Sequence, residues 1–360
     1  MGTPLPGMMM SQHHGMQWPC RLAGRAESDF RAEYASKHAL PSRPKREPPL
    51  AALQHTLASA FSFKGVGLHE GRVATVRVMP APAGYGRRFV RDGSEITGTL
   101  GNVVGTALSV ELSEALHDGA AAVSVRTVEH LLSALVGLQV DNARIEIEGG
   151  SEIPLMDGSS APFVNMIRSA GGTVVAPNFY PRSRLCLLRP VTVAADDAWI
   201  AAFPLGHGAQ TRITYGINFS ELPSIGEQWV SWEPSTERYG IDIAHARTFG
   251  IAEQVDHLRS LGLIRGGTLD NALLCSKHTG WVNPPLRYVP DEPCRHKVLD
   301  LVGDLGLLGG GLANGLGGLP HAHIVAYKAS HKLHIQLAKG LADALAEGTA
   351  ALITERDEAV

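Results

Sequence analysis

The sequence of 360 residues has no long apolar run and no excess of charge of either sign. Its most apolar stretch, residues 298–319, is interrupted by Asp300, Asp304 and many glycines, which argues against a membrane-spanning helix there. The 32 basic and 35 acidic residues give a formal net charge of −3, so no basic surface is expected for a phosphate backbone. We therefore expect neither a transmembrane segment nor binding to nucleic acid.

Cysteine is also scarce. The four cysteines are far apart and form no CxxC pair, which is typical of a protein from a reducing compartment. They are Cys20, Cys186, Cys275 and Cys294. Two catalytic signatures are missing as well, because the chain contains neither a P-loop motif nor a GxSxG motif. Mechanisms that depend on a phosphate loop or a serine nucleophile therefore lose support.

Acidic residues are absent from the chain up to Ala26, whereas Arg21 and Arg25 are present. This is the charge bias of an organelle transit peptide. Residues 1–50 also hold seven of the 22 prolines and show no hydrophobic periodicity. We predict that residues 1–50 form a disordered extension, whose charge bias is compatible with a transit peptide.

Regular patterns begin at Gln54. Alternation of apolar and polar residues predicts strands at 73–78, 143–148 and 213–217. Helical spacing of apolar residues predicts helices at 127–138, 251–261 and 332–346. Strands and helices thus occur in both halves, and the strands are not separated one by one by helices. This order favours an α+β fold with mainly antiparallel sheets over a doubly wound parallel sheet.

Residues 171–183 have the glycine and proline content of a linker, so we place a domain boundary there. The predicted organisation is an N-terminal α+β domain at 51–178, a similar C-terminal α+β domain at 179–348, and a C-terminal tail at 349–360.

The segment 293–304 carries the strongest chemical signal. On a helix, His296, Asp300 and Asp304 step by four residues and share one face. Apolar residues cover the other faces, so the polar row is expected to point into an enclosed place. One interpretation is a salt-bridged helix face. The other is a metal site, because an imidazole and a carboxylate at this spacing can bind one divalent cation, with a third ligand from elsewhere.

Two further segments supply candidate partners. Adjacent Glu129 and His130 lie near the start of a predicted helix, where the imidazole can complete the metal site and the carboxylate can reach the metal's water. His331 lies beside Lys328, after a strand-like run, and can serve as a general acid with the lysine as an anion contact. A helix-entry histidine without a role is equally compatible with this local pattern.

Nine segments, taken in order, resemble the UDP-3-O-acyl-N-acetylglucosamine deacetylase (LpxC) family, the zinc enzymes of lipid A synthesis. The likeness runs from about Gln54 to about Leu341. The segments are Gly65–His69, Thr127–Leu135, Asp141–Asn142, Pro154–Ser159, Ala246–Phe249, Gly266–Asn271, Leu286–Tyr288, His296–Asp304 and Tyr327–His331. Within this family the chain looks closest to the plant branch, whose members are mitochondrial.

The resemblance implies a fold of two domains, each a β-sheet packed with helices, facing one another with the active site between them. It also implies a role for each matching residue. The metal ligands would be His130, His296 and Asp300. Glu129 would be the general base, His331 the general acid, and Asp304 the carboxylate partner of His331. Lys297 would stabilise the developing charge, and Lys328 and His69 would contact the substrate.

One position departs from the family pattern. Many bacterial members have a threonine at the strand position that aligns with Gly216, where its hydroxyl helps to hold the developing oxyanion. In this chain Thr214 or a backbone donor would have to take that role.

The resemblance further implies one Zn²⁺ per chain, although two histidines and an aspartate also accept Fe²⁺. The implied substrate is a small UDP-acyl-sugar, the expected oligomeric state is a monomer, and the expected location is the mitochondrion, or the cytoplasm for a bacterial chain. Two alternatives stay open. The alternatives to the UDP-3-O-acyl-N-acetylglucosamine deacetylase are a non-catalytic metal-binding homologue and a deacetylase of another N-acetyl sugar.

Overall fold

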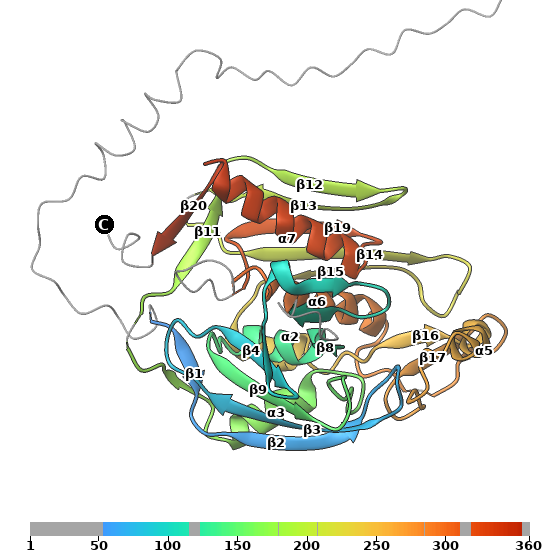
Figure 1. Cartoon of the computed structure of the whole chain (residues 1–360). Helices are drawn as coiled ribbons and strands as arrows, with labels where there is room; N and C mark the ends of the chain where they lie inside the picture. Colours follow the sequence, from blue (N-terminus) through green and yellow to red (C-terminus); the bar gives the residue numbers. More distant parts are fainter. Residues whose placement is uncertain are drawn as a thin grey trace, which may run out of the picture. The chain divides into compact units, whose positions relative to one another are not determined.

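The computed structural model describes residues 53–114, 123–178, 180–206, 208–283, 285–309 and 318–354 (Figure 1). All of them belong to one compact unit, Pro48–Ala359. The predicted disordered extension at 1–50 lies outside the described residues. The division into domains at 51–178 and 179–348 stays a prediction.

A five-stranded sheet forms in the N-terminal half, with the strand order β2-β3-β9-β4-β5. Its strands are β2 (Phe61–Val66), β3 (Val73–Pro80), β4 (Arg87–Arg91), β5 (Ser94–Thr97) and β9 (Ala143–Glu148). Neighbours are antiparallel except β4 and β9, which are parallel. Ala143, Ile145 and Ile147 are buried as the alternation predicts, so this strand presents one face to the core.

The C-terminal half repeats this topology. Its sheet has the order β12-β13-β19-β14-β15, again with one parallel pair, β14 and β19. The strands are β12 (Val191–Ala195), β13 (Ala198–Pro204), β14 (Arg212–Phe219), β15 (Gly226–Trp232) and β19 (Ala322–Tyr327). The predicted α+β class with mainly antiparallel sheets is confirmed.

Four helices cover the inner faces of the two sheets. They are α2 (Glu129–Gly137), α3 (Ala161–Ser169), α6 (Glu292–Leu305) and α7 (His331–Ala346). In Figure 1 the two sheets lie at the bottom and at the top, with α2 and α6 between them. The helices predicted at 127–138 and 332–346 are confirmed. Their apolar sides, with those of the sheets, form one continuous core.

Shorter strands form small sheets beside the two main ones. They are β1 (His55–Leu57) with β10 (Thr173–Val175), β11 (Ser183–Leu187) with β20 (Ala350–Thr354), and the small sheet of β6 (Val103–Gly105), β7 (Glu111–Glu114) and β8 (Val123–Arg126). Two expectations need correction. Part of the expected linker at 171–183 is β-strand, and residues 350–354, expected in a tail, pair with β11.

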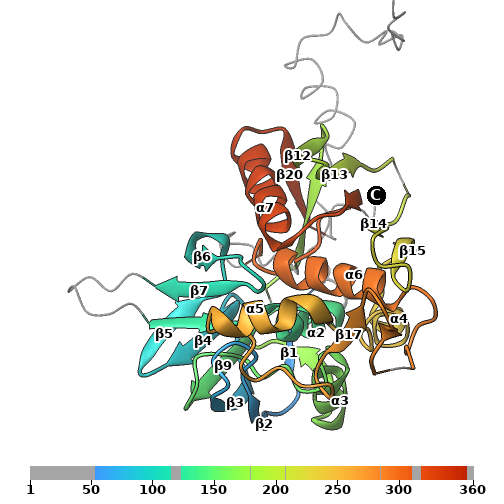
Figure 2. The same cartoon turned by 90° about the vertical axis from the view of Figure 1, so that its right-hand side faces the viewer.

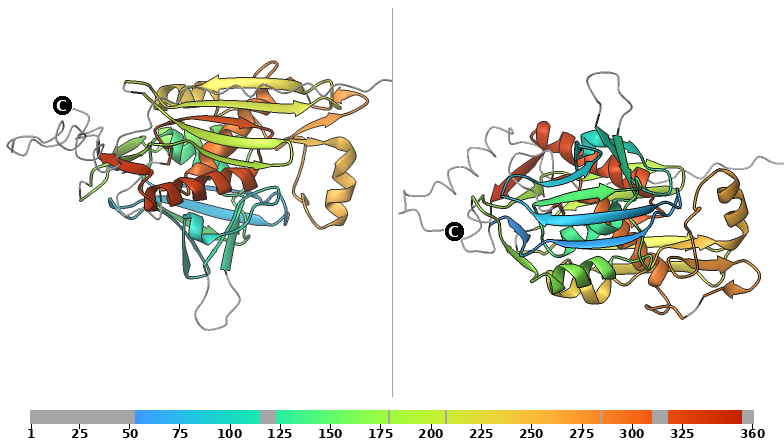
Figure 3. Two further views of the ribbon diagram at one scale, coloured as in Figure 1. Left: turned by 90° about the horizontal axis from the view of Figure 1, so that it is seen from above. Right: turned by 60° about the horizontal axis from the view of Figure 1, so that its bottom comes forward.

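One segment of the second half leaves the sheet. It consists of β16 (Phe249–Ile251), a 3₁₀ turn (Ala252–Gln254), α5 (Val255–Ser260), β17 (Leu273–Ser276) and β18 (Gly280–Trp281). The helix predicted at 251–261 is therefore too long, because Ile251 pairs with Cys275 in a parallel strand. Figure 2 looks onto α5 and β17, and Figure 3 shows the segment extending beyond the sheet edge.

The remaining described helices are short: α4 (Thr236–Asp242) and the 3₁₀ turn Leu100–Asn102. None of the helices in the described parts of the chain is long and apolar enough to cross a membrane.

Candidate active site

Helix α6 carries a buried polar row. His296 and Asp300 are each 2% exposed, and Asp304 is fully buried. Their four-residue spacing puts all three on one face of the helix, while Val298 and Leu301 pack into the core. The prediction that this row points into an enclosed place is confirmed.

The start of α2 packs directly against α6. A Cβ atom at Gly303 would lie 2.1 Å from the carbonyl oxygen of Glu129, so the close approach of the two helices requires glycine there. Ser133 of α2 donates a hydrogen bond of 2.8 Å to the carbonyl of Leu299. Thr127 turns the chain into α2 with a φ of 60°, a conformation that a β-branched residue rarely adopts. These contacts place Glu129 and its neighbour His130 beside the polar row.

Three ligand atoms converge between the two helices. The Nε2 atoms of His130 and His296 lie 3.6 Å and 3.3 Å from Asp300 Oδ1. All three atoms lie within 4.8 Å of one another. Bonds of about 2.0–2.2 Å at tetrahedral angles would put zinc ligand atoms roughly 3.4 Å apart. Asp300 Oδ1 is buried without a hydrogen-bond partner. The donor set and this orphaned oxygen therefore fit a divalent cation.

The second polar atoms of His296 and Asp300 are held by the protein. His296 Nδ1 lies 3.0 Å from the carbonyl oxygen of Ala246, which can only accept, so Nδ1 carries the proton and the Nε2 lone pair faces the site. Burial lowers the pKa of His296 to about 3, which keeps the imidazole neutral. Lys297 Nζ donates to Asp300 Oδ2 at 2.8 Å. The lysine therefore holds Oδ2, while Oδ1 faces the other two ligand atoms.

The loop that supplies the Ala246 carbonyl is itself fixed. Glu292, fully buried at the start of α6, accepts hydrogen bonds from the backbone N of Arg247 at 3.1 Å and from its Nε at 2.8 Å. Because Arg247 follows Ala246, this ion pair sets the position of the carbonyl that orients His296.

Glu129 and His331 face each other beside the metal group. His331 Nε2 lies 3.9 Å from Glu129 Oε1 and 4.0 Å from Asp300 Oδ2, while its Nδ1 binds Asp304 Oδ2 at 2.7 Å. Burial alone would lower the pKa of His331, but Asp304 and Asp300 outweigh it and raise the pKa to about 9. Burial raises the pKa of Glu129. The arrangement offers a proton acceptor and a proton donor on one reacting centre.

The structure does not bring Thr214 to this site. Side chains alternate along β14, and Tyr215 faces the helices. Thr214 lies on the opposite face, where its hydroxyl is 3.0 Å from His323 Nε2 and 3.1 Å from Ser231 Oγ. Gly216 shares that outer face with Thr214. The role considered for Thr214 in holding the oxyanion is therefore corrected.

Two other expected substrate contacts lie at the margins. Lys328 forms an ion pair with Asp197 of the β12–β13 turn. His69 is 2% exposed, and its Nε2 lies 3.3 Å from the hydroxyl of Ser109. The next residue, Val110, donates its backbone N–H to Glu129 Oε2 at 3.1 Å. His69 thus lies close to the loop that binds Glu129, although none of the described hydrogen bonds or ion pairs joins it to the three ligand residues.

Sequence reasoning missed three groups that shape the site: His334, Tyr215 and the carbonyl of Ala246. His334 Nδ1 lies 2.8 Å from Asp304 Oδ2, and its Nε2 lies 2.8 Å from the Tyr215 hydroxyl. The three-residue spacing of His331 and His334 on one helix is a signal that could have revealed the second histidine. A backbone carbonyl leaves no such signal in a sequence.

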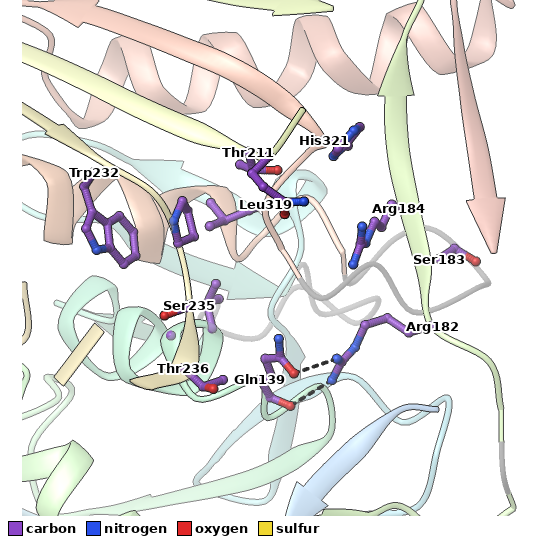
Figure 4. Close-up of a pocket in the computed structure, with 14 residues that line it drawn as sticks. Gln139, Arg182, Ser183, Arg184, Thr211, Trp232, Ser235, Thr236, Leu319 and His321 are labelled. Atoms are coloured by element: carbon purple, nitrogen blue, oxygen red, sulfur yellow. Dashed lines mark hydrogen bonds between the residues drawn. The ribbon is translucent and has the colours of Figure 1, made fainter. Parts of the chain in front are cut away.

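The pocket drawn in Figure 4, about 160 Å³ in volume, is separate from this centre. Val136 and Gly137 at the end of α2 line it, roughly 12 Å along the helix from Glu129. Arg182 in its wall donates to the side-chain oxygen of Gln139 at 2.9 Å and to its carbonyl at 3.1 Å. The guanidinium of Arg182 is therefore already hydrogen-bonded within the protein.

Comparison with known proteins assigns the chain to a family. The family model described as LpxC, UDP-3-O-acyl N-acetylglycosamine deacetylase, matches residues 54–343. The chain belongs to this deacetylase family. A Nostoc sp. protein named UDP-3-O-acyl-N-acetylglucosamine deacetylase is 49% identical over 295 residues, which cover 79% of this chain and 97% of that protein.

Other relatives come from two groups of organisms. A Synechocystis deacetylase of the same name is 46% identical, with 80% of this chain and 98% of the relative covered. An Arabidopsis thaliana protein named probable UDP-3-O-acyl-N-acetylglucosamine deacetylase 1, mitochondrial, is 45% identical, with 81% and 89% covered. The likeness therefore extends to cyanobacterial and plant members of the deacetylase family.

Proposed function

We propose that this chain is a zinc-dependent amidohydrolase that removes the N-acetyl group of UDP-3-O-acyl-N-acetylglucosamine and releases acetate, an early step of lipid A biosynthesis. The observation that supports this most is the convergence of His130, His296 and Asp300, with Glu129 and His331 within about 4 Å of one another beside them. The names of the relatives supply the substrate.

The ion would be held by His130, His296 and Asp300. When bound there, zinc supplies a Lewis acid that polarises the acetyl carbonyl and lowers the pKa of water toward ~7. The same donors also suit Fe²⁺. The chain's own part is to keep the imidazole of His296 neutral, to leave Asp300 Oδ1 free for the ion, and to hold Asp300 Oδ2 on Lys297.

Glu129 takes a proton from the attacking water as the water oxygen bonds to the acetyl carbon. Its carboxylate is suited to this, because burial raises its pKa and makes it a stronger base. Lys297 lies beside Asp300 and can stabilise the charge that develops on the carbonyl oxygen. Cleavage of the carbon–nitrogen bond then needs a proton on the leaving amine, and the cationic His331 donates it while Asp304 holds its other nitrogen.

The substrate is larger than the amide that reacts. Lys328, at the edge of the site, can supply positive charge for the UDP pyrophosphate. The acyl chain would lie on the segment from β16 to β18, which exposes Leu261 and Leu269. This segment begins at the site, because the ring of Phe249 lies 6.5 Å from that of His296 and meets it at 82°.

A mitochondrial location and a monomeric state complete the proposal. The absence of acidic residues up to Ala26 and the presence of Arg21 and Arg25 support targeting. The Arabidopsis relatives that carry "mitochondrial" in their names point the same way. A fusion of residues 1–50 to a fluorescent protein tests the location, and sedimentation of the full chain tests the oligomeric state.

The function is tested by acetate release from UDP-3-O-acyl-N-acetylglucosamine with the full zinc-loaded chain. We expect release that a chelator abolishes and added zinc restores. Parallel reactions with UDP-N-acetylglucosamine and free N-acetylglucosamine test for another N-acetyl sugar. Release only from these would replace the substrate assignment, and no release from any of them by metal-loaded protein would support a non-catalytic homologue.

A further inference from the structure

Asp304 is shared by two histidines, only one of which the proposed reaction uses. The Nδ1 atoms of His331 and His334 lie 2.7 Å and 2.8 Å from the same oxygen, Asp304 Oδ2. The other oxygen, Oδ1, is buried without a hydrogen-bond partner. The side-chain hydrogen bonds that fix the rotation of this carboxylate are therefore those two at Oδ2.

His334 is fully buried and is itself held at its far nitrogen. Its Nε2 lies 2.8 Å from the hydroxyl of Tyr215, which is also 2.8 Å from the carbonyl oxygen of Ala329. Burial lowers the pKa of His334 and favours the neutral imidazole. A neutral imidazole that donates at Nδ1 accepts at Nε2, where the single proton of Tyr215 is shared between this nitrogen and the carbonyl oxygen of Ala329. A chain of contacts thus runs from Tyr215 through His334 and Asp304 to His331.

The cluster of Asp304, His331 and His334 also has three potential metal-ligand atoms within 4.8 Å of one another. Hydrogen bonding explains the geometry better than a second cation. Both Nδ1 atoms aim at one carboxylate oxygen at 2.7–2.8 Å, the distance of a charge-assisted hydrogen bond. Each nitrogen then carries a proton and has no lone pair for a metal.

We propose that His334 is a positioning residue that holds the Asp304 carboxylate in the orientation that presents Oδ2 to His331. This inference rests on the proposed deacetylase function, in which His331 gives a proton to the leaving amine. If the hydrogen bond from His334 is lost, the carboxylate is held on one side only and can rotate, so His331 is less well aligned. His334 itself touches neither the metal ligands nor Glu129 in the described hydrogen bonds.

Two variants of similar polarity separate this role from simple packing. In His334→Asn the amide nitrogen lies near the position of Nδ1 and can still donate to Asp304. In His334→Gln it lies near the position of Nε2 and reaches Tyr215 instead. We expect His334→Asn to retain most of kcat, and His334→Gln and His334→Ala to lower kcat roughly 10- to 100-fold with KM unchanged. Equal losses in the Asn and Gln variants, or a loss confined to KM, would overturn the proposal.

A double variant tests whether His334 acts through His331. In a His331→Gln background, His334→Gln should cause little further loss of kcat, because the alignment it supports no longer matters. Multiplicative losses would indicate an independent structural effect. Zinc content should stay at one ion per chain throughout, and a second equivalent that disappears with His334→Gln would show a metal site in place of the hydrogen bonds.

A readout without turnover separates this inference from the proposed function. In wild-type protein we expect two downfield imidazole N–H proton resonances, one from each hydrogen bond to Asp304. His334→Gln should remove one and shift the other, whereas His334→Asn should leave the His331 resonance in place. An unshifted His331 resonance in the Gln variant would refute the positioning role, while absence of acetate release by the wild type would refute only the deacetylase function.

Discussion

Helices α2 and α6 occupy the same place in the two halves, since each precedes the central strand of its own sheet, β9 or β19. Their polar content differs. Helix α6 carries polar residues along its buried face from His296 to Asp304, over more than two turns. Helix α2 has Glu129 and His130 in its first turn only, and its body is mostly aliphatic, as at Leu135.

The helices that follow the central strands differ in the same way. Helix α7 opens with His331 and His334, whereas α3 opens with Ala161 and Phe163, which pack into the core. The repeated topology therefore duplicates the scaffold but divides the chemistry unequally. Changes along α6 should act on metal binding and turnover, and changes in the body of α2 should act on the stability of the fold.

The largest effect is expected from Asp300→Ala on α6. Removal of the carboxylate takes away one of three ligand atoms and leaves Lys297 without its partner. We expect the metal content to fall to near zero and acetate release to fall to the level of chelator-treated wild type. Metal analysis by mass spectrometry checks this. Asp291→Ala, which removes a half-buried ion pair with Arg295 at the start of the same helix, is the control and should keep its metal.

Glu129→Gln should lower kcat by roughly 10²- to 10⁴-fold, because the amide cannot take the proton of the attacking water. Metal content should stay near one ion per chain, since Glu129 is not among the three ligand residues. Kinetics and metal analysis on the same preparation test both statements. Loss of the metal in this variant would mean that Glu129 is a ligand, and the contrast between α2 and α6 would then weaken.

Gly303→Ala tests the close contact between α6 and the first turn of α2, which places Glu129 beside the metal-ligand residues. The added methyl group would lie 2.1 Å from the Glu129 carbonyl oxygen, so the helices must separate. We expect a stability loss of about 1–3 kcal/mol, together with lower kcat, because Glu129 moves with the backbone. Urea unfolding and steady-state kinetics measure the two effects.

Leu135→Ala is the matched control for Gly303→Ala. Leu135 is fully buried in α2 and lies more than one turn beyond Glu129. Its truncation should cost about 2–5 kcal/mol of unfolding free energy while the folded protein keeps its kcat. If Leu135→Ala lowered kcat as much as Gly303→Ala does, the local role of the Gly303 contact would be refuted.

Periodicity within a single element predicted much of this arrangement. The four-residue spacing of His296, Asp300 and Asp304 defines one helix face without any knowledge of its partners. Periodicity does not predict which residues on different elements come together. The meeting of α6 with Glu129 depends on the space left by Gly303, and the tautomer of His296 depends on the backbone of Ala246. Neither contact has a periodic signal. The local pattern offered Glu129 and His130 only as candidate partners, and the family resemblance assigned them to the same site as His296 and Asp300.

Tertiary pairing also overrode one local pattern. The helical spacing at 251–261 continued to Ile251, but the backbone of this residue pairs with Cys275 of β17, so α5 starts only at Val255. The energy of a strand ladder with a distant segment exceeds a weak helix preference, and a window of neighbouring residues does not contain that information.

The smallest effect is expected from Thr214→Val, on the outer face of the second sheet. The substitution keeps the shape of the side chain and removes a hydroxyl that contacts only His323 and Ser231 among the described hydrogen bonds. Stability should fall by about 0.5–1.5 kcal/mol or less, as for one partly exposed hydrogen bond, and kcat and KM should not change. A tenfold loss of kcat would place substrate on the outer face. The comparison of the two halves would then have to include the outer face of the second sheet, because Thr214 lies on that face and Tyr215 on the inner one.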